Sequence, residues 1–322
     1  MTCTLKQLAE QLNVSIGTVS LALRNSPLVA EKTRKRIIEL AESQDYVQSS
    51  FGRALQSRCS KLIGVLLPTL TSSFFNELLQ GAGEGAVSSG YGLMLGWITE
   101  DKEYTNPQIT LMLEKEIDAL IIASHGKNFD FYANRFIRRN KPVVYCNGSP
   151  SENCSSVCTD DVLGGKLAVQ ALAEYGHKKI LCAQYYSSRW AGNQAAASQY
   201  GVQLVPFTDY NAVLPLFAGD RDITGIVCHS DEGASLVMHT LRHHGYSDTG
   251  DFSIIGYNDL SIASHPEFQL TTVAQQRKNL GSTAVEIALE QLKNPGNHPT
   301  HRLLDPFLVK RQTLNPARRR KK

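Results

Sequence analysis

The apolar residues near the start of the chain repeat with the period of an α-helix. The repeat at i, i+3, i+4 and i+7 is formed by Leu5, Leu8, Ala9 and Leu12. Thr4 and Gln7 have the form of a capping box, with a hydroxyl at the N-cap and an amide three residues later. Asn13 and Val14 interrupt the repeat. The pattern therefore predicts a first helix that begins after Thr4 and ends near Leu12.

Two further helices are predicted before residue 46. Ser15 is placed to cap a second helix that runs through Leu23, and a third helix over about 31–44 follows Pro27. The face of the second helix that does not pack inward is formed by Gly17, Ser20, Leu21 and Arg24. Two helices joined by a short turn, and then a third, are typical of a helix-turn-helix. A generic three-helix bundle is the alternative.

From residue 61 onward the pattern changes to short, continuous apolar runs beside helical stretches. The runs lie at 62–68, 92–97, 119–123, 142–146, 179–183, 202–207, 225–228 and 253–257. Such strands, alternating with helices, are typical of parallel sheets that are covered on both faces. We therefore expect an α/β body of two doubly wound parallel-sheet subdomains, with four strands in each. Ligands of such folds bind beyond the carboxyl ends of the strands, so a cleft between the subdomains is the expected site.

Charge is distributed unevenly along the 322 residues. Residues 1–61 have a balance of +4, residues 62–317 have −6, and the tail 318–322, Arg-Arg-Arg-Lys-Lys, adds +5. A basic head on an acidic body indicates that the head meets a polyanion such as DNA.

Several classes of protein are disfavoured by what the sequence lacks. No apolar run approaches the roughly 20 residues that span a bilayer, and the N-terminus lacks the profile of a signal peptide. We therefore expect a cytoplasmic protein without membrane contact. The seven cysteines include no CxxC pair, and only Cys154 and Cys158 lie close together. We expect no metal, no cofactor and no catalytic residues.

The residues of the predicted head resemble those of a known family. The run from Leu5 to Ser20, LKQLAEQLNVSIGTVS, is similar to the start of proteins of the lactose/galactose repressor family. The family pattern Val-Ser-x-x-Thr-Val-Ser is complete at 14–20, and the runs 31–34 and 45–46 also match. The resemblance implies an all-α helix-turn-helix head and a body like the periplasmic binding proteins.

The resemblance also implies which residues meet DNA. The major groove would be read by Ile16, Gly17, Ser20, Leu21 and Arg24. Phosphate contacts would come from Ser15, Thr18, Thr33 and Arg34, and Thr4 and Gly52 are also expected at the DNA. The family usually has arginine where this chain has Leu21. Arginine reads guanine, whereas leucine offers only apolar contact, for instance to a thymine methyl group. The resemblance therefore implies the mode of DNA binding but leaves the operator sequence open.

The family places a hinge helix between head and body, with a leucine that enters the minor groove. Leu55 matches that residue and would act as a wedge that kinks the duplex. An ordinary linker is the alternative. We expect a DNA-binding domain over 1–46, a hinge over 47–60, an effector-binding and dimerisation domain over 61–317, and a basic tail. The effector-binding and dimerisation domain would comprise two subdomains. Subdomain 1 would span about 62–158 and 277–306, and subdomain 2 about 159–276 and 307–317.

Matches to the family continue through the body and imply an effector site. The matching runs lie at 63–65, 176–180, 189–192, 230–232, 256–259 and 270–273. The implied effector-binding residues are Phe74, Phe75, Asn147, Arg189, Ser230 and Asn258. For Phe74 and Phe75 a place in the core is an equal alternative. Asn147 and Asn258 stand where the family often has aspartate, so two effector classes stay open: a neutral sugar, or an anion such as a sugar phosphate or a carboxylate.

Two other functions are alternatives to a DNA-binding regulator. A dinucleotide-dependent enzyme needs Gly-x-Gly-x-x-Gly after its first strand, where this chain has residues 68–73, PTLTSS. A solute-binding protein of a transport system would need export and would leave the head unexplained. We therefore expect a transcriptional regulator, in the manner of a repressor, that binds a pseudo-palindromic operator as a homodimer. Its effector would be a sugar or a sugar phosphate.

Overall fold

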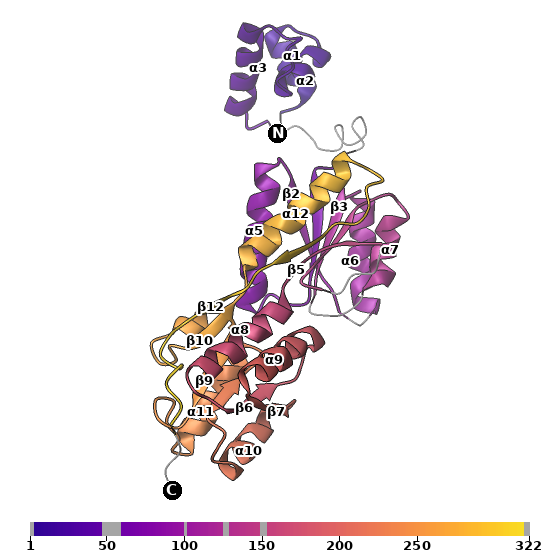
Figure 1. Ribbon diagram of the computed structural model, residues 1–322. Coiled ribbons are helices and arrows are strands. Elements are labelled where there is room, and N and C mark those ends of the chain that lie inside the picture. The colour runs from indigo at the N-terminus through magenta and orange to yellow at the C-terminus, as the bar shows by residue number, and fades with distance from the viewer. Residues whose placement is uncertain (1–2, 47–58, 100–101, 125–128, 149–152, 319–322) are drawn as a thin grey trace. The chain divides into compact units, whose positions relative to one another are not determined.

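The computed structural model describes residues 3–46, 59–99, 102–124, 129–148 and 153–318 (Figure 1). The chain forms two compact units, residues 1–60 and residues 61–322. Each unit has its own hydrophobic core. Within the described residues no helix is long and apolar enough to cross a bilayer.

In its described residues, 3–46 and 59–60, the first unit forms the helices α1 (Leu5–Leu12), α2 (Ile16–Leu23) and α3 (Glu31–Ser43). The predicted capping box is present, because the Thr4 hydroxyl accepts from the backbone of Gln7 and the Gln7 side chain accepts from the backbone of Thr4. Ser15 caps α2 by accepting from the backbone N–H of Thr18 at 3.0 Å. The helices meet in a core of Leu8, Ala9, Val19, Ala22, Val29, Ile37 and Ala41. Sequence therefore predicted all three helices to within one residue.

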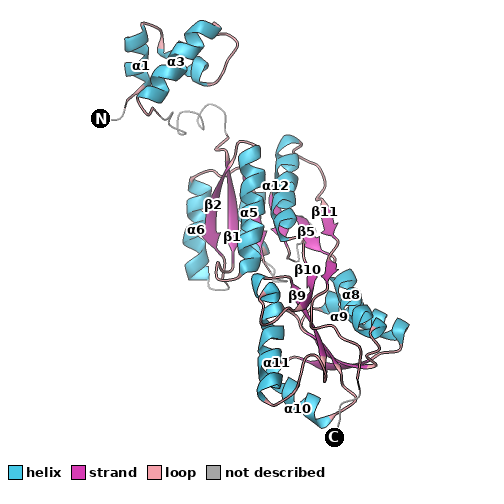
Figure 2. Ribbon diagram, turned by 90° about the vertical axis from the view of Figure 1, so that its left-hand side faces the viewer, coloured by secondary structure: helices cyan, strands magenta, loops and turns pink. Residues whose placement is uncertain are grey.

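The first half of the body is a six-stranded parallel sheet in the order β11-β5-β4-β3-β1-β2. Its strands are β1 (Leu62–Leu67), β2 (Gly92–Trp97), β3 (Ala119–Ala123), β4 (Val143–Cys146), β5 (Ser155–Thr159) and β11 (His301–Leu304). Its helices are α5 (Ser73–Ser88), α6 (Lys102–Glu114), α7 (Asp130–Ile137) and α12 (Arg277–Lys293). Buried residues of α5 and α12 pack on one face, and those of α6 and α7 pack on the other. Figure 2 shows α6 and α5 on opposite sides of β1 and β2.

The second half is a six-stranded sheet in the order β12-β10-β9-β8-β6-β7, in which only β12 is antiparallel. Its strands are β6 (Lys179–Ala183), β7 (Gln203–Phe207), β8 (Gly225–Val227), β9 (Ser253–Asn258), β10 (Thr271–Ala274) and β12 (Phe307–Val309). Its helices are α8 (Asp161–Glu174), α9 (Ser187–Tyr200), α10 (Val213–Gly219) and α11 (Asp231–His243), with short 3-10 turns at Tyr210–Ala212 and Ser261–Ser264. Helices α8 and α9 cover one face, and α10 and α11 cover the other.

The expectation of four strands in each sheet was wrong, because each sheet has six. The missed strands β5 and β10 consist largely of serine and threonine, and β11 and β12 are short and half-exposed. None of them has the continuous apolar run by which the other eight were found. The chain passes between the sheets after β5, after β10 and after β11.

Glycines allow two helix pairs to approach unusually closely. A Cβ added at Gly81 of α5 would overlap the carbonyl oxygen of Lys278, and one at Gly281 of α12 would overlap that of Leu78. The α8–α9 pair in the other half has the same arrangement at Gly165 and Gly192. In both halves a small residue on each helix therefore brings the two backbones into contact.

Candidate functional site

Helix α2 presents large apolar side chains to solvent on one face. Val19 and Ala22 are fully buried against the other helices, which turns the opposite face outward. On that face Ile16 is 51% exposed and Leu21 is 36% exposed. Exposed aliphatic side chains beside a capped helix N-terminus lose contact with water only when a partner covers them. The first unit therefore presents two exposed aliphatic side chains on the face of α2 that does not pack inward.

The other residues of the head that the sequence predicts at DNA are exposed or half-buried. Gly17 and Arg24 are exposed and Ser20 is half-buried along α2. The hydroxyls of Ser15 and Thr18 lie 2.8 Å apart at the start of α2. Thr4 is exposed at the N-cap of α1, and Thr33 and Arg34 are half-buried in the first turn of α3. Gly52 and Leu55 lie outside the described residues.

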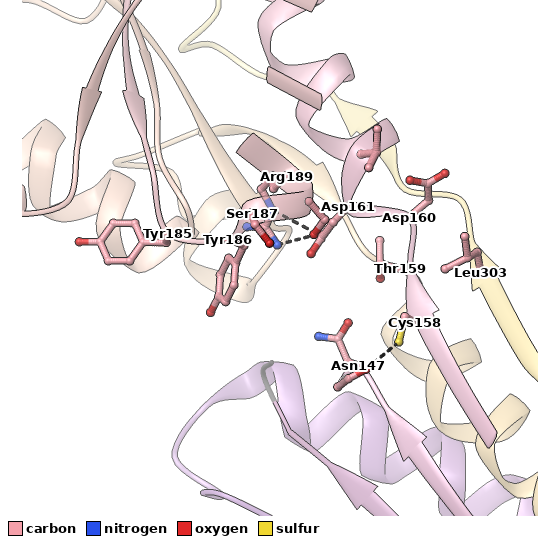
Figure 3. A pocket seen from close by; sticks show the side chains of 13 residues that line it. Asn147, Cys158, Thr159, Asp160, Asp161, Tyr185, Tyr186, Ser187, Arg189 and Leu303 are labelled. Carbon is pink, nitrogen blue, oxygen red and sulfur yellow. Dashed lines mark hydrogen bonds and ion pairs between the residues drawn. The ribbon is translucent and has the colours of Figure 1, made fainter. Parts of the chain in front are cut away.

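The body contains a cavity of about 530 Å³ where the two sheets meet (Figure 3). The loop after β4 contributes Asn147, and the end of β5 with the start of α8 contributes Cys158 to Val162. The opposite wall comes from the loop after β6 and the start of α9. The full lining is Asn147, Gly148, Cys158, Thr159, Asp160, Asp161, Val162, Tyr185, Tyr186, Ser187, Ser188, Arg189 and Leu303.

Arg189 is held rigidly in the wall of this cavity (Figure 3). Its Nε and Nη2 donate to Oδ1 of Asp161 at 3.1 and 2.8 Å, and its Nη1 donates to the carbonyl of His229 at 2.9 Å. The guanidinium carbon lies 3.4 Å from the ring centroid of Tyr257, a cation–π contact. The close approach of α8 and α9 at Gly165 and Gly192 brings the two partners together.

The charges of the cavity are fixed by these contacts. Burial lowers the pKa of Arg189, but Tyr257 and Asp161 outweigh burial and raise it, so the guanidinium stays charged. Burial also raises the pKa of Cys158, whose thiol donates to the carbonyl of Gly148 at 3.2 Å. With a neutral thiol, the described lining has one cation, Arg189, and two carboxylates, Asp160 and Asp161.

Only two of the six effector residues expected from sequence line this cavity, namely Asn147 and Arg189. Phe74 and Phe75 are 1% and 2% exposed and belong to the core that α5 forms with the first sheet. Ser230 accepts from the backbone N–H of Gly233 and caps α11. Asn258 accepts a 2.7 Å hydrogen bond from Gln275.

Sequence reasoning missed Asp160, Asp161 and the aromatic pair Tyr185 and Tyr186. The two aspartates follow β5, a strand whose Ser- and Thr-rich sequence was not recognised, so their place at the carboxyl edge of the sheet was not foreseen. Adjacent acidic residues at the end of a strand would have been the available signal. Among the described residues, no group of three His, Cys, Asp or Glu side chains is placed to hold a metal ion.

Comparisons with known proteins agree with this architecture. Residues 4–49 match the family described as bacterial regulatory proteins, lacI family, and residues 168–314 match the periplasmic binding protein-like domain. The HTH-type transcriptional repressor PurR of Photobacterium profundum is 26% identical over 97% of this chain and 98% of its own length.

Solved structures show the same fold. A lac repressor dimer bound to operator and the anti-inducer ONPF superposes with a TM-score of 0.83 at 23% identity, covering 98% of this chain and 100% of that one. A LacI family transcriptional regulator from Enterococcus faecium with bound ribose superposes with a TM-score of 0.69 at 24% identity, covering 80% of this chain and 100% of that one.

Proposed function

Because the chain belongs to the lacI family of bacterial regulatory proteins, we propose that it regulates transcription by binding operator DNA in the cytoplasm under the control of a small-molecule effector. The head is the DNA-binding element and the body binds the effector. The action is that of a repressor, as in the relative PurR.

The observation that carries DNA binding is the exposed face of α2. Ile16 and Leu21 stand on it, beside Gly17, Ser20 and Arg24, where a recognition helix contacts base edges in the major groove. Ser15, Thr18, Thr33 and Arg34 lie at helix starts, where hydroxyls, backbone N–H groups and a cation suit phosphates. Thr4 adds a further hydroxyl, and Gly52 and Leu55 complete the proposed interface at the hinge.

The proposed effector site is the cleft that contains the cavity, with Asn147 and Arg189 in its wall and Phe74, Phe75, Ser230 and Asn258 on the surrounding elements. A cavity of about 530 Å³ lined by amide, hydroxyl, carboxylate and guanidinium groups suits a polar metabolite of sugar size. The Enterococcus faecium neighbour holds ribose, which supports a sugar or sugar phosphate as the class of effector.

We further propose that two chains bind one pseudo-palindromic operator, as the structural neighbour from the lac system is a dimer on its operator. The functional domains would be 1–46, 47–60 and 61–317, with the body divided at about 158, 276 and 306. The passages after β5, β10 and β11 support this division.

The two rival functions fit less well. PurR, which matches this chain over nearly its whole length, is a repressor, so the chain is not an enzyme. A solute-binding protein shares the body fold but leaves residues 4–49 and their family match without a role.

Selection of genomic fragments by the purified protein tests the proposal. We expect recovery of a few sites that share an approximately palindromic sequence, and a gel shift on those sites that exceeds the shift on random DNA of equal length. A metabolite panel in a thermal-shift assay would then identify compounds that also change the gel shift. Equal affinity for selected and random fragments would refute sequence-specific regulation.

A further inference from the structure

Arg189 has little capacity left for an anionic ligand. Three of its five N–H groups are already used, two by Asp161 and one by the carbonyl of His229. The Asp161 carboxylate neutralises the guanidinium at 2.8 Å, and the side chain of Arg189 is only 11% exposed. An arginine that binds a phosphate or a carboxylate in a bidentate manner needs one edge with two free N–H groups. Here Asp161 occupies the Nε–Nη2 edge, and the carbonyl of His229 takes one N–H of Nη1.

Asp161 itself keeps an acceptor for a ligand. Three groups donate to Oδ1 of Asp161: Nε and Nη2 of Arg189, and the hydroxyl of Tyr257 at 3.0 Å. Among the contacts of the described residues none engages Oδ2, and the side chain is 25% exposed at the cavity. A carboxylate oxygen accepts from hydroxyl and N–H donors and repels another anion.

The rest of the cavity wall also favours an uncharged ligand over an anion. Asp160 adds a second carboxylate, one oxygen of which caps α8 by accepting from the backbone of Leu163 at 2.9 Å. Asn147 and Thr159 add an amide and a hydroxyl. The described lining therefore has a net charge of −1. Arg277, the other arginine that is buried among the described residues of the body, lies outside this lining and is paired with Glu77 at 3.1 Å.

We infer that Asp161 is the specificity-determining residue of this cleft: by occupying Arg189 it selects an uncharged polyhydroxylated effector over the corresponding phosphate or carboxylate. The inference rests on the effector-binding role proposed above and narrows it. A hydroxyl pair of the ligand would donate to Oδ2 of Asp161 and accept from the remaining N–H groups of Arg189.

Sulfate is a suitable probe, since its charge does not change near neutral pH and no knowledge of the natural effector is needed. Its affinity is measured by calorimetry on the full chain at constant ionic strength, with chloride as the balancing ion. We expect wild type to bind sulfate weakly and Asp161→Asn to bind it at least about tenfold more tightly, because one negative charge next to the guanidinium is removed. The double variant D161N/R189A should lose this gain.

Asp160→Asn is the matched control. It removes the same charge from the cavity wall, does not touch Arg189, and asparagine still caps a helix. We expect a smaller gain in sulfate affinity, of no more than about threefold, because Asp161 still occupies the guanidinium. Asp161→Ala serves as a second variant if circular dichroism shows that Asp161→Asn is misfolded. Sulfate binding to the basic head is the same in every variant, so differences report the cleft.

Three results would overturn the inference. They are tight sulfate binding by wild type, a gain that persists in the double variant, and an equal gain in Asp160→Asn. Because no DNA is present, these results are independent of the gel shift. A protein that fails to bind operator can still show the Asp161 effect, and one that binds operator can lack it.

Discussion

Asp231 is a carboxylate with no exposure to solvent, at the start of α11. Its Oδ2 accepts from the backbone of Leu260 at 2.6 Å, and its Oδ1 accepts from the Thr272 hydroxyl at 2.5 Å. Burial outweighs these two donors and raises the pKa of Asp231 from 3.8 to about 7. The folded body therefore holds a proton that the unfolded chain releases at a much lower pH.

This difference makes the free energy of unfolding depend on pH. Because the folded pKa lies above the unfolded one, the stabilisation is complete below about pH 4 and is lost as pH rises to about 7. Asp231→Asn should remove that loss, which amounts to at most about 1.4 kcal/mol per pH unit. Urea unfolding at pH 5 and pH 8 measures it. An unchanged pH profile in Asp231→Asn would contradict the assignment.

Leu21 is the residue at which the operator preference should be altered. Its side chain is exposed, so Leu21→Arg can be introduced without disturbing the head core. Arginine forms paired hydrogen bonds with guanine worth about 1–3 kcal/mol of discrimination, which leucine does not. Sites selected by Leu21→Arg should gain a G·C pair at one position of each half-site. Identical sites for wild type and variant would show that Leu21 does not face bases.

At the scale of elements, the close contact between α5 and α12 depends on glycine. Gly81→Ala should destabilise the body by about 1–3 kcal/mol, because the added methyl group overlaps the backbone of α12. Gly83→Ala, in the same helix, is the control. A Cβ there meets only Leu93 at 3.9 Å, so the higher helix propensity of alanine should stabilise by about 0.5–1 kcal/mol. Chemical denaturation distinguishes the two, and equal effects would argue against the close packing.

The same scale shows what sequence alone predicts. Helices α1 to α3 and eight strands follow from apolar periodicity and caps, which are local properties. Strands β5, β10, β11 and β12 do not, since none of them has a continuous apolar run and only their pairing in the sheets defines them as strands. The residues of the candidate site were likewise predicted only in part. Asn147 and Arg189 lie in the cavity wall, whereas Asp161 was missed because its contact with Arg189 arises only when α8 packs on α9.

At the scale of the whole molecule, different residues should determine the overall affinity for DNA and the preference for operator over random DNA. Arg34→Ala should weaken binding to operator and to random DNA alike, because a phosphate contact is lost. The slope of the logarithm of the binding constant against the logarithm of the salt concentration should fall in magnitude by about 1. Leu55→Ala should weaken operator binding more than random binding, since an apolar wedge stabilises only a kinked duplex. Titrations at several salt concentrations measure both. Equal losses on the two DNAs for Leu55→Ala would exclude the wedge.

The three points at which the chain passes between the two sheets also affect how the protein folds during its synthesis. The first sheet is complete only after α12 and β11 have been synthesised. The buried α12 residues Leu280, Ala284 and Ile287 cover the same core as α5. At about 5–20 residues per second, a ribosome needs roughly 6–24 s to proceed from Thr159 to Arg277. During that time the nascent first subdomain exposes an apolar face and an unpaired strand edge, the features that chaperones bind and that lead to aggregation. A chain that stops at residue 276 should accordingly be insoluble, although most of both sheets has been synthesised.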